Sequence, residues 1–466
     1  MNARAAVAAP RRALGHVAAV LERFFHAEAA SGILLIFAGA LALAWANSPW
    51  AESYQRLWQA SLGFRLGDLT LERSLLWLVN DGLMTIFFFV VGLEIRRELH
   101  DGELSQWRRA ALPVAAAVGG IVVPASIYLA LAGAAETRAG WGVPMATDIA
   151  FALGILSLLG KRVPSALRVL LLACAVIDDL AAILVIALFY SSGVSVMGLA
   201  VALAAFAAVL LLRRLGVRAP LAYVPPAIVA WAGVYAAGFH PTIAGVILGL
   251  LTPVTALLLP EEGLSRARRS LAAIAARGAP GTQDDALPTG EPSEAVPDAD
   301  DAAPPSSDEL SEQLRPLRFL HRDVEAPTTR LIDALHPWVA FGVMPVFALA
   351  NAGVALGGAP LDATAVGVAV AVAAALVIGK PIGVIAASWL TLRLGVSSLP
   401  AGLSLRHVVV LGAVTGVGFT MSLFIAQLAF TDEGLLSAAK LGVLCASAAA
   451  AVATLVLGRA LLRPVG

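Results

Sequence analysis

Long apolar runs recur along this chain, and they constrain its fold more than any other feature of the sequence. A helix needs about 20 apolar residues to cross a bilayer. Runs of that kind centre on residues 30–48, 75–95, 110–133, 143–160, 165–190, 194–212, 220–237, 240–258, 335–353, 364–390, 404–430 and 434–457. The sequence therefore predicts an all-α polytopic membrane protein with about twelve transmembrane helices.

The composition agrees with a membrane protein and disfavours other classes. Of the 466 residues, 59% are apolar and 14% are charged, whereas an average soluble domain is about 25% charged. Ten-residue segments of alternating polarity are not a feature of the chain, which argues against an outer-membrane barrel. The formal net charge is zero, so nothing in the composition points to nucleic acid as a partner.

The Lys and Arg residues predict the orientation of the spans. If the N-terminus is inside, the inside segments carry most of the 32 basic residues, as the positive-inside rule requires. Both termini are then cytoplasmic, because the number of spans is even. Residues 1–28 form a cytoplasmic leader rather than a cleaved signal peptide, and residues 458–466 form a cytoplasmic tail.

Two connections between spans are unusual. Residues 259–332 are acidic and rich in proline, which predicts a disordered cytoplasmic insert between spans 1–8 (29–258) and spans 9–12 (333–457). Residues 49–74 form an external connection, where apolar and polar residues alternate around Gly67-Asp68. This alternation predicts a small hairpin.

Spans 4 and 11 contain residues that interrupt helices. These are Gly142, Pro144 and Gly154 in span 4, and Gly412, Gly416 and Gly418 in span 11. Interruptions at matching places in two halves predict discontinuous helices around a midplane binding site, with spans 3–5 and 10–12 as the corresponding units. The alternative is that the glycines only allow neighbouring helices to approach closely.

Ionisable side chains inside the spans are few, and each is costly in hydrocarbon, so a functional role is the default expectation. They are Asp81, Glu94, Glu98, Asp148, Asp178, Asp179 and Lys380. Asp178 and Asp179 lie in the middle of an otherwise apolar span, where neighbouring residues point about 100° apart. Carboxylates are suitable ligands for a small cation. A site that holds either a cation or protons is the minimum needed to exchange one for the other.

Lys380 is the one basic residue that this span assignment leaves inside a span. It could neutralise an aspartate or the negative end of a broken helix, and Asp148 could neutralise a positive helix end. A role for Lys380 as a proton carrier is the alternative, and the two roles are compatible.

A cluster at the cytoplasmic end of span 2 contains Glu94, Arg97 and Glu98. It is either an interfacial salt-bridge cluster or a charged entrance that titrates and gathers cations. His240 and His336 are further titrating candidates, although a histidine before a proline is also a common polar residue at a helix start. No phosphate-binding loop is present, which disfavours ATP as the energy source.

Several long motifs resemble one family. VNDGLMTIFFFVVGLEIRREL, MATDIAFALG, IDDLAAILVIALFY, GFHPTIAGVILG, LHPWVAFGVMPVFALANAGV, IGKPIGV and GVGFTMSLFIA are similar to the NhaA-type sodium/proton antiporters of bacterial inner membranes. The resemblance runs from about residue 25 to residue 457 and omits only the acidic insert.

The resemblance implies a twelve-helix fold with inverted repeats, in which the fourth and eleventh helices unwind and cross. It implies electrogenic export of Na⁺ or Li⁺ in exchange for more than one proton (two in the family), in Na⁺ and pH homeostasis, with no cofactor. Asp178 and Asp179 would bind cations and protons, and Lys380 would pair with Asp178 when no cation is bound. Asp148 and Lys380 would balance the helix ends, with Thr147 beside them.

The resemblance also places Glu94, Arg97 and Glu98 in a pH-response cluster and makes the hairpin at 49–74 a homodimer contact in the lipid bilayer. The chain departs from the family at Ile332 and Asp333, where the family has an acidic residue and a histidine. These departures affect the expected pH profile. Two other functions remain as alternatives, a Na⁺-coupled symporter of an organic anion and a passive cation channel.

Overall fold

The computed structural model describes residues 30–66, 69–191, 193–217, 219–255, 325–356 and 362–463. The predicted leader and most of the predicted insert lie outside these residues. The chain divides into a large unit, Met1–Leu251 with Ile332–Gly466, and a small unit, Thr252–Leu331. Within the small unit, the backbone N–H and the hydroxyl of Thr328 both donate to the carbonyl of Pro253, at 3.2 and 2.7 Å. The site described below lies in the large unit.

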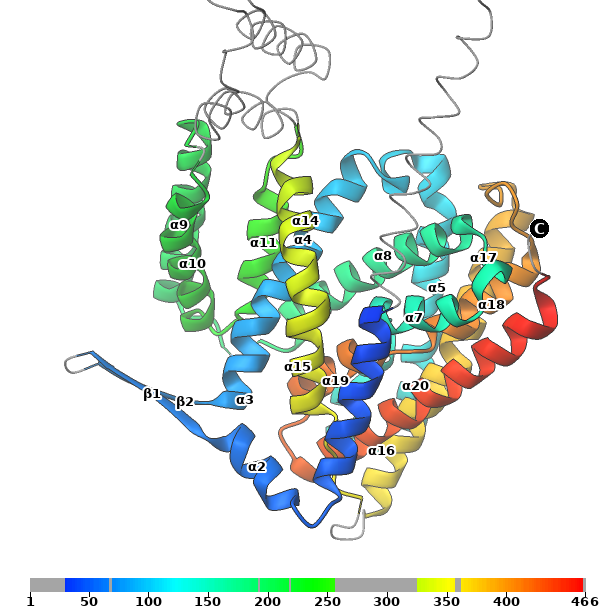
Figure 1. Ribbon diagram of the computed structural model, residues 1–466, viewed down its shortest axis with the longest axis horizontal. Helices are drawn as coiled ribbons and strands as arrows, with labels where there is room; N and C mark the ends of the chain where they lie inside the picture. Colours follow the sequence, from blue (N-terminus) through cyan, green and yellow to red (C-terminus); the bar gives the residue numbers. More distant parts are fainter. Residues whose placement is uncertain are drawn as a thin grey trace, which may run out of the picture. The chain divides into compact units, whose positions relative to one another are not determined.

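Each of the twelve apolar runs coincides with helical structure in the described residues. The α-helices are Ala30–Ala46, α2 (Ala51–Gln59), α3 (Leu75–Trp77), α4 (Met84–His100), α5 (Trp107–Leu131), α6 (Ala135–Arg138), α7 (Ile149–Leu158), α8 (Ser165–Phe189), α9 (Val196–Arg214), α10 (Val224–Ala236), α11 (Thr242–Leu251), α14 (Pro327–Trp338), α15 (Met344–Asn351), α16 (Ala363–Ala374), α17 (Lys380–Arg393), α18 (Leu405–Thr415), α19 (Phe419–Ala429) and α20 (Glu433–Leu461) (Figure 1). Among the described residues, seven helical stretches are long and apolar enough to cross a bilayer, and up to ten are if each bent pair is one crossing. The protein is an integral membrane protein.

The segment at 49–74 differs from the prediction in its first half. Helix α2 occupies Ala51–Gln59, and only then do the strands β1 (Ser61–Leu66) and β2 (Leu69–Ser74) form an antiparallel hairpin. The sequence prediction missed α2, whose Tyr54 and Trp58 lie one turn apart and are both buried. The hairpin extends away from the helices (Figure 1).

Three long helical stretches contain a wider, π-helical turn. These turns are η1 (Leu78–Leu83), η6 (Val339–Val343) and η7 (Ala375–Gly379). Pro345 and Pro381 follow the second and third turns. Because proline has no N–H to donate, it removes a hydrogen bond from the regular helical pattern at these places. Such turns often occur at functional sites, and η7 directly precedes Lys380.

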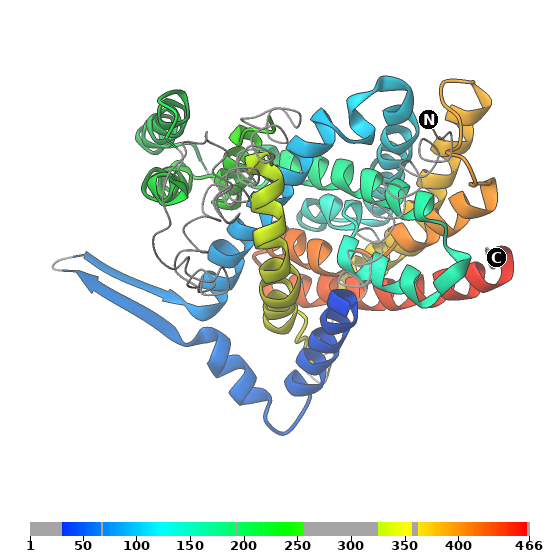
Figure 2. The ribbon, with the colours of Figure 1, turned by 45° about the horizontal axis from the view of Figure 1, so that its top comes forward.

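Glycines set the distance between several helices. A Cβ atom on Gly119 of α5 would lie 2.2 Å from the carbonyl oxygen of Gly383 in α17, and a Cβ atom on Gly383 would lie 2.0 Å from the carbonyl oxygen of Gly119. The helices α9 and α10, at one edge of the bundle, touch in the same way through Gly198 and Gly233 (Figure 2). Small residues allow this close approach in membranes.

A second basic residue lies inside the apolar helices. Lys440 occupies the second turn of α20 and is partly buried. Lys380 is therefore not the one basic residue inside the apolar helices.

Candidate functional site

Two helix breaks meet at the centre of the site. The stretch Ala135–Met145 and α7 differ in direction by 51°, and α18 and α19 differ by 44°. At the first break, the backbone N–H of Asp148 donates to the carbonyl of Val417 in the second break, at 2.8 Å. The hydroxyl of Thr147 donates to the carbonyl of Thr415 at 3.3 Å. Backbone groups freed by one break are therefore satisfied by the other, as burial in a membrane protein requires.

Asp148 stabilises the first turns of both helices that follow the breaks. One carboxylate oxygen accepts the backbone N–H of Phe151 in α7 at 3.0 Å. The other accepts the backbone N–H of Thr420 in α19 at 3.1 Å and also its hydroxyl. A carboxylate is favourable at a helix N-terminus because the free N–H groups there carry partial positive charge. Asp148 has this role at two helices and is 1% exposed.

Lys380 is fully buried and contacts the breaks from α17. Its ammonium lies 3.0 Å from a carboxylate oxygen of Asp178 and also donates to the backbone carbonyl of Met145. Met145 is the last residue of the 3₁₀-helical stretch η3 (Ala139–Met145), whose carbonyl end carries partial negative charge. The ammonium therefore has two negative partners.

Asp178 and Asp179 lie in the middle of α8 and have different surroundings. Asp178 accepts the hydroxyl of Thr147 at 2.7 Å with the same oxygen that faces Lys380. Asp179 makes no ion pair of this kind with any of the described residues. One oxygen of each carboxylate (Oδ1 in both) is buried without a hydrogen-bond partner among the described residues. Buried polar atoms without a protein partner are expected where water or an ion binds.

A cavity of about 70 Å³ extends from Asp148 and Asp179 to Glu94 in the second half of α4. Its polar lining consists of Ser31, Glu94, Thr147, Asp148, Asp179 and His336. The remaining wall is mainly apolar. This volume holds a few water molecules or one partly hydrated cation. No group of three or more His, Cys, Asp and Glu side chains that could hold a metal ion occurs in the described parts of the chain, so hydroxyl, backbone or water oxygens would have to complete the coordination of a cation.

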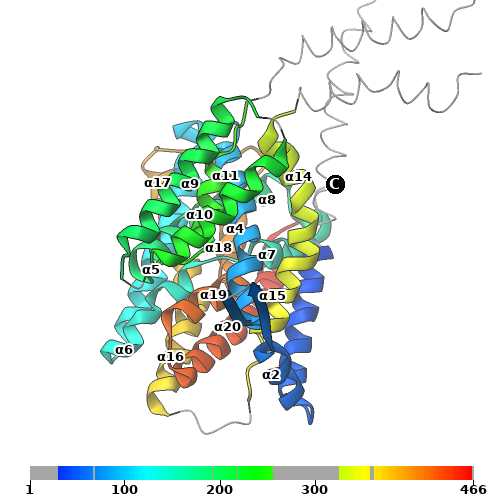
Figure 3. The ribbon, with the colours of Figure 1, turned by 90° about the vertical axis from the view of Figure 1, so that its left-hand side faces the viewer.

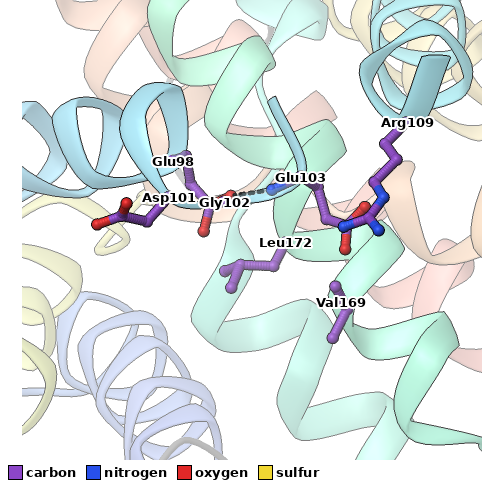
Figure 4. Close-up of a pocket in the computed structure, with 8 residues that line it drawn as sticks. Glu98, Asp101, Gly102, Glu103, Arg109, Val169 and Leu172 are labelled. Atoms are coloured by element: carbon purple, nitrogen blue, oxygen red, sulfur yellow. Dashed lines mark hydrogen bonds between the residues drawn. The ribbon is translucent and has the colours of Figure 1, made fainter. Parts of the chain in front are cut away.

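The charged cluster on α4 is divided between two pockets. Glu94 faces the cavity, whereas Glu98 lines a second pocket of about 200 Å³ together with Asp101, Glu103 and Arg109 (Figure 4). A carboxylate oxygen of Glu98 accepts the backbone N–H of Glu103 at 3.1 Å.

Arg97 interacts electrostatically with both Glu94 and His336. His336 therefore lies with Glu94 at the same end of the cavity. Of the two residues that depart from the family pattern, Ile332 is buried and Asp333 is exposed on α14.

His240 lies elsewhere. Its Nε2 atom is 3.1 Å from a carboxylate oxygen of Asp81, and its Nδ1 atom is 2.9 Å from the hydroxyl of Thr242. Its ring contacts Phe424 edge-on, with the ring centroids 5.2 Å apart. The structure therefore separates the two histidines that the sequence placed in one group.

The sequence prediction missed Thr420, which supplies two of the three hydrogen bonds to Asp148. The available signal was its position two residues after Gly418. A hydroxyl residue just after a helix break often bonds to a nearby polar group, but the reasoning from the residues themselves considered only ionisable side chains, and Thr147 entered through the resemblance.

Comparisons with known proteins identify the family. A family model described as Na+/H+ antiporter 1 matches residues 22–457. The "Na(+)/H(+) antiporter NhaA 2" of Myxococcus xanthus is 61% identical over 442 residues, covering 95% of this chain and 89% of that protein. The protein of the same name in Sorangium cellulosum is 51% identical and covers 95% and 90%. "Na(+)/H(+) antiporter NhaA" of Bordetella petrii is 50% identical and covers 94% and 90%.

These relatives are named as antiporters, which are transporters and not enzymes. The family model covers nearly all of the helical region described above, including both helix breaks, the aspartate pair and Lys380. The chain belongs to the Na+/H+ antiporter 1 family.

Proposed function

We propose that this protein is a secondary active Na⁺/H⁺ antiporter of the bacterial inner membrane. The observation that carries the proposal is the carboxylate of Asp179, which is buried, faces the cavity and has an oxygen without a hydrogen-bond partner in the described residues. A buried carboxylate must be protonated or must bind a cation, because an isolated charge is unfavourable in a medium of low dielectric constant. The two states exclude each other, so one site serves both ions.

The neighbouring Asp178 completes the exchange. With no cation bound, its charge is balanced by Lys380 at 3.0 Å. A Na⁺ or Li⁺ ion between the two aspartates competes with the ammonium for Asp178 and with a proton for Asp179. Export of one cation is then coupled to the entry of more than one proton, two by resemblance to the family, and the exchange is electrogenic.

The fold supports an alternating-access mechanism. We infer twelve spans, with η3–α7 and α18–α19 as the discontinuous fourth and eleventh spans and with spans 3–5 and 10–12 as inverted repeats. Both termini are cytoplasmic, and the β1–β2 hairpin is external and forms a homodimer contact. Glu94, Arg97, Glu98 and His336 set the pH response from the cytoplasmic side, and His240 contributes from the other side.

The alternative of an organic-anion symporter is disfavoured by the size and charge of the cavity. A volume of about 70 Å³ is well below the roughly 300–1,000 Å³ of ordinary small-molecule pockets. The one buried Lys beside it is already paired with Asp178. A passive channel does not require this ion pair.

Proton movement in proteoliposomes tests the proposal. We expect Na⁺ and Li⁺, but not choline, to release protons from acid-loaded vesicles containing the wild-type protein at neutral to alkaline pH. Asp179→Asn should remove the response completely. Glu52→Gln is the matched control, because Glu52 is an exposed carboxylate on α2. Cation flux without proton movement in the wild type would contradict antiport.

A further inference from the structure

Three side-chain amides form a closed ring of hydrogen bonds between three helical segments. Asn80 of η1 donates to Gln427 of α19 at 2.5 Å, Gln427 donates to Asn351 of α15, and Asn351 donates back to Asn80 at 2.8 Å. Asn351 is 1% exposed and also donates to the carbonyl of Phe347 at 3.0 Å. Each amide in this ring donates one hydrogen bond and accepts one. We call this group the amide ring.

An aromatic layer lies next to the amide ring. Phe424 of α19 contacts Phe88 of α4 and Phe347 of α15, with ring centroids 5.4 and 6.1 Å apart. Phe424 precedes Gln427 by three residues, so the two share a face of α19. The ring of His240, which pairs with Asp81, contacts Phe424 edge-on.

The cavity, the aromatic layer and the amide ring follow one another along three helical segments, which are α19, α15 and η1 with α4. These segments lie side by side (Figure 3). In α19, Met421 lines the cavity of Asp179, Phe424 belongs to the aromatic layer and Gln427 to the amide ring.

In α15 the order is Met344, Phe347 and Asn351, with Met344 at the cavity. From η1 to α4 it runs in reverse, with Asn80 in the ring, Phe88 in the layer and Val90 at the cavity. Six residues of helix separate Met421 from Gln427, a rise of about 9 Å. The amide ring therefore closes the side of the cavity that is opposite to Glu94 and His336.

We propose that the amide ring is the external gate of the ion site, held closed by neutral hydrogen bonds in the conformation described here. This proposal rests on the proposed antiport function, which requires access to Asp179 from both sides in turn. For the external side to open, α19 has to separate from η1 and α15, and the hydrogen bonds of Gln427 to Asn80 and Asn351 have to break.

The chemistry of the amide ring suits a gate that opens in every cycle. Neutral amide hydrogen bonds exchange readily for bonds to water, so their net contribution is small. A buried ion pair in the same place would leave uncompensated charge when broken. The π-helical turn η1, which carries Asn80 and Asp81, is a local departure from regular helix of the kind that is frequent at functional sites.

Thiol labelling from the external side tests the gate without relying on transport. The background is a chain with Cys174→Ala and Cys445→Ala, since these are its two cysteines. Met421→Cys then places one thiol at the cavity wall. A small, membrane-impermeant methanethiosulfonate reagent is applied to right-side-out or inside-out vesicles, and the labelling rate is measured from each side.

We expect Gln427→Leu to raise the external labelling rate of Met421→Cys about tenfold, because two hydrogen bonds of the closed state are lost, and to lower the cytoplasmic rate. The double variant Asn80→Gln with Gln427→Asn exchanges the two side chains and keeps three amides in the ring. It should restore the slow external labelling rate of Met421→Cys. If Gln427→Leu does not reach the membrane, Asn80→Leu breaks the ring from another helix and should give the same result.

An external rate that does not change in either leucine variant would overturn the gate. An equal increase in the labelling rate from both sides would also overturn the gate, because that result would show a general loss of packing. Failure of the antiport proposal can be told apart from failure of the gate by an assay of the wild-type protein. If the antiport proposal is wrong, the wild type shows no exchange of Na⁺ for protons, whatever the labelling rates are.

Discussion

Asp148 accepts hydrogen bonds from the first turns of two helices, and this double role has a consequence for stability. Asp148→Ala removes its bonds to Phe151 and Thr420 at once. Loss of one helix cap typically costs about 1 kcal/mol, so we expect a loss of about 2 kcal/mol or more and a lower melting temperature in detergent.

Asp362→Ala is the matched control for this change. Asp362 caps one helix, α16, through the backbone N–H of Ala365 at 2.7 Å. We expect a loss of about 1 kcal/mol. Equal shifts in melting temperature for the two variants would show that the second cap of Asp148 does not contribute.

The two aspartates of α8 should respond differently to the same substitution. Asp179→Asn removes the charge that has no buried ammonium beside it, and we expect it to abolish exchange without loss of folding or membrane insertion. Asp178→Asn leaves Lys380 with the carbonyl of Met145 as a partner and should reduce exchange only in part. Exchange is measured as sodium-driven proton release. Equal, partial losses in both variants would contradict this division of roles.

At the level of single residues, much of the site could be predicted from the sequence, because an ionisable residue is conspicuous in an apolar helix. Asp148, Asp178, Asp179, Lys380 and Thr147 were candidates, and the structure brings them together. Neutral polar residues gave a weaker signal. Asparagine, glutamine and threonine are tolerated in helices for many reasons, so nothing in the sequence alone indicated that Asn80, Asn351 and Gln427 would meet.

Helices α5 and α17 are held close by two facing glycines, and α17 carries Lys380. Gly383→Ala would place a Cβ atom about 2.0 Å from the carbonyl oxygen of Gly119, so the helices must separate. Overpacking of this kind typically costs about 1–3 kcal/mol. We expect lower thermal stability and reduced exchange, since the displacement also moves Lys380 relative to Asp178.

Gly367→Ala provides the control for that prediction. Gly367 lies in α16, and a Cβ atom there would meet nothing within 4 Å. Alanine is favoured over glycine inside a helix by up to about 1 kcal/mol, so this variant should be as stable as the wild type or more stable. If Gly383→Ala and Gly367→Ala melt at the same temperature, close contact between α5 and α17 is not required.

The positions of the helices followed from hydropathy, but their internal irregularities did not. Apolar runs mark where a helix can cross, and glycine marks where it can break, as at Gly416 and Gly418. The π-helical turns η1, η6 and η7 were not predicted. They depend on how a helix packs against its neighbours, which a single sequence does not contain.

At the scale of the whole molecule, the β1–β2 hairpin is distinctive among the described residues because it extends away from the helices (Figure 1). The strands β1 and β2 pair with each other over six residues each, which leaves both outer edges unpaired. Unpaired edges are suited to pairing with another chain. We expect deletion of residues 62–73 to convert a homodimer into a monomer in native mass spectrometry, while exchange activity is retained. A deletion variant that remains dimeric would place the contact elsewhere.

Orientation and the number of spans are predicted from averages over many residues, and both stay predictions. The predicted insert at 259–332 is set apart by its composition, and most of it lies outside the described residues. The pairing of distant segments, such as the contact between Asp148 and Val417, depends on the folded chain. A single sequence does not indicate which two interruptions will face each other.

The two partners of Lys380 have a consequence for the speed of the cycle. In the proposed exchange, a cation displaces the ammonium from Asp178, while the hydrogen bond from the ammonium to the carbonyl of Met145 can stay in place. The ammonium would then keep its position while its ionic partner changes. We expect such a site to need little reorganisation between turnovers.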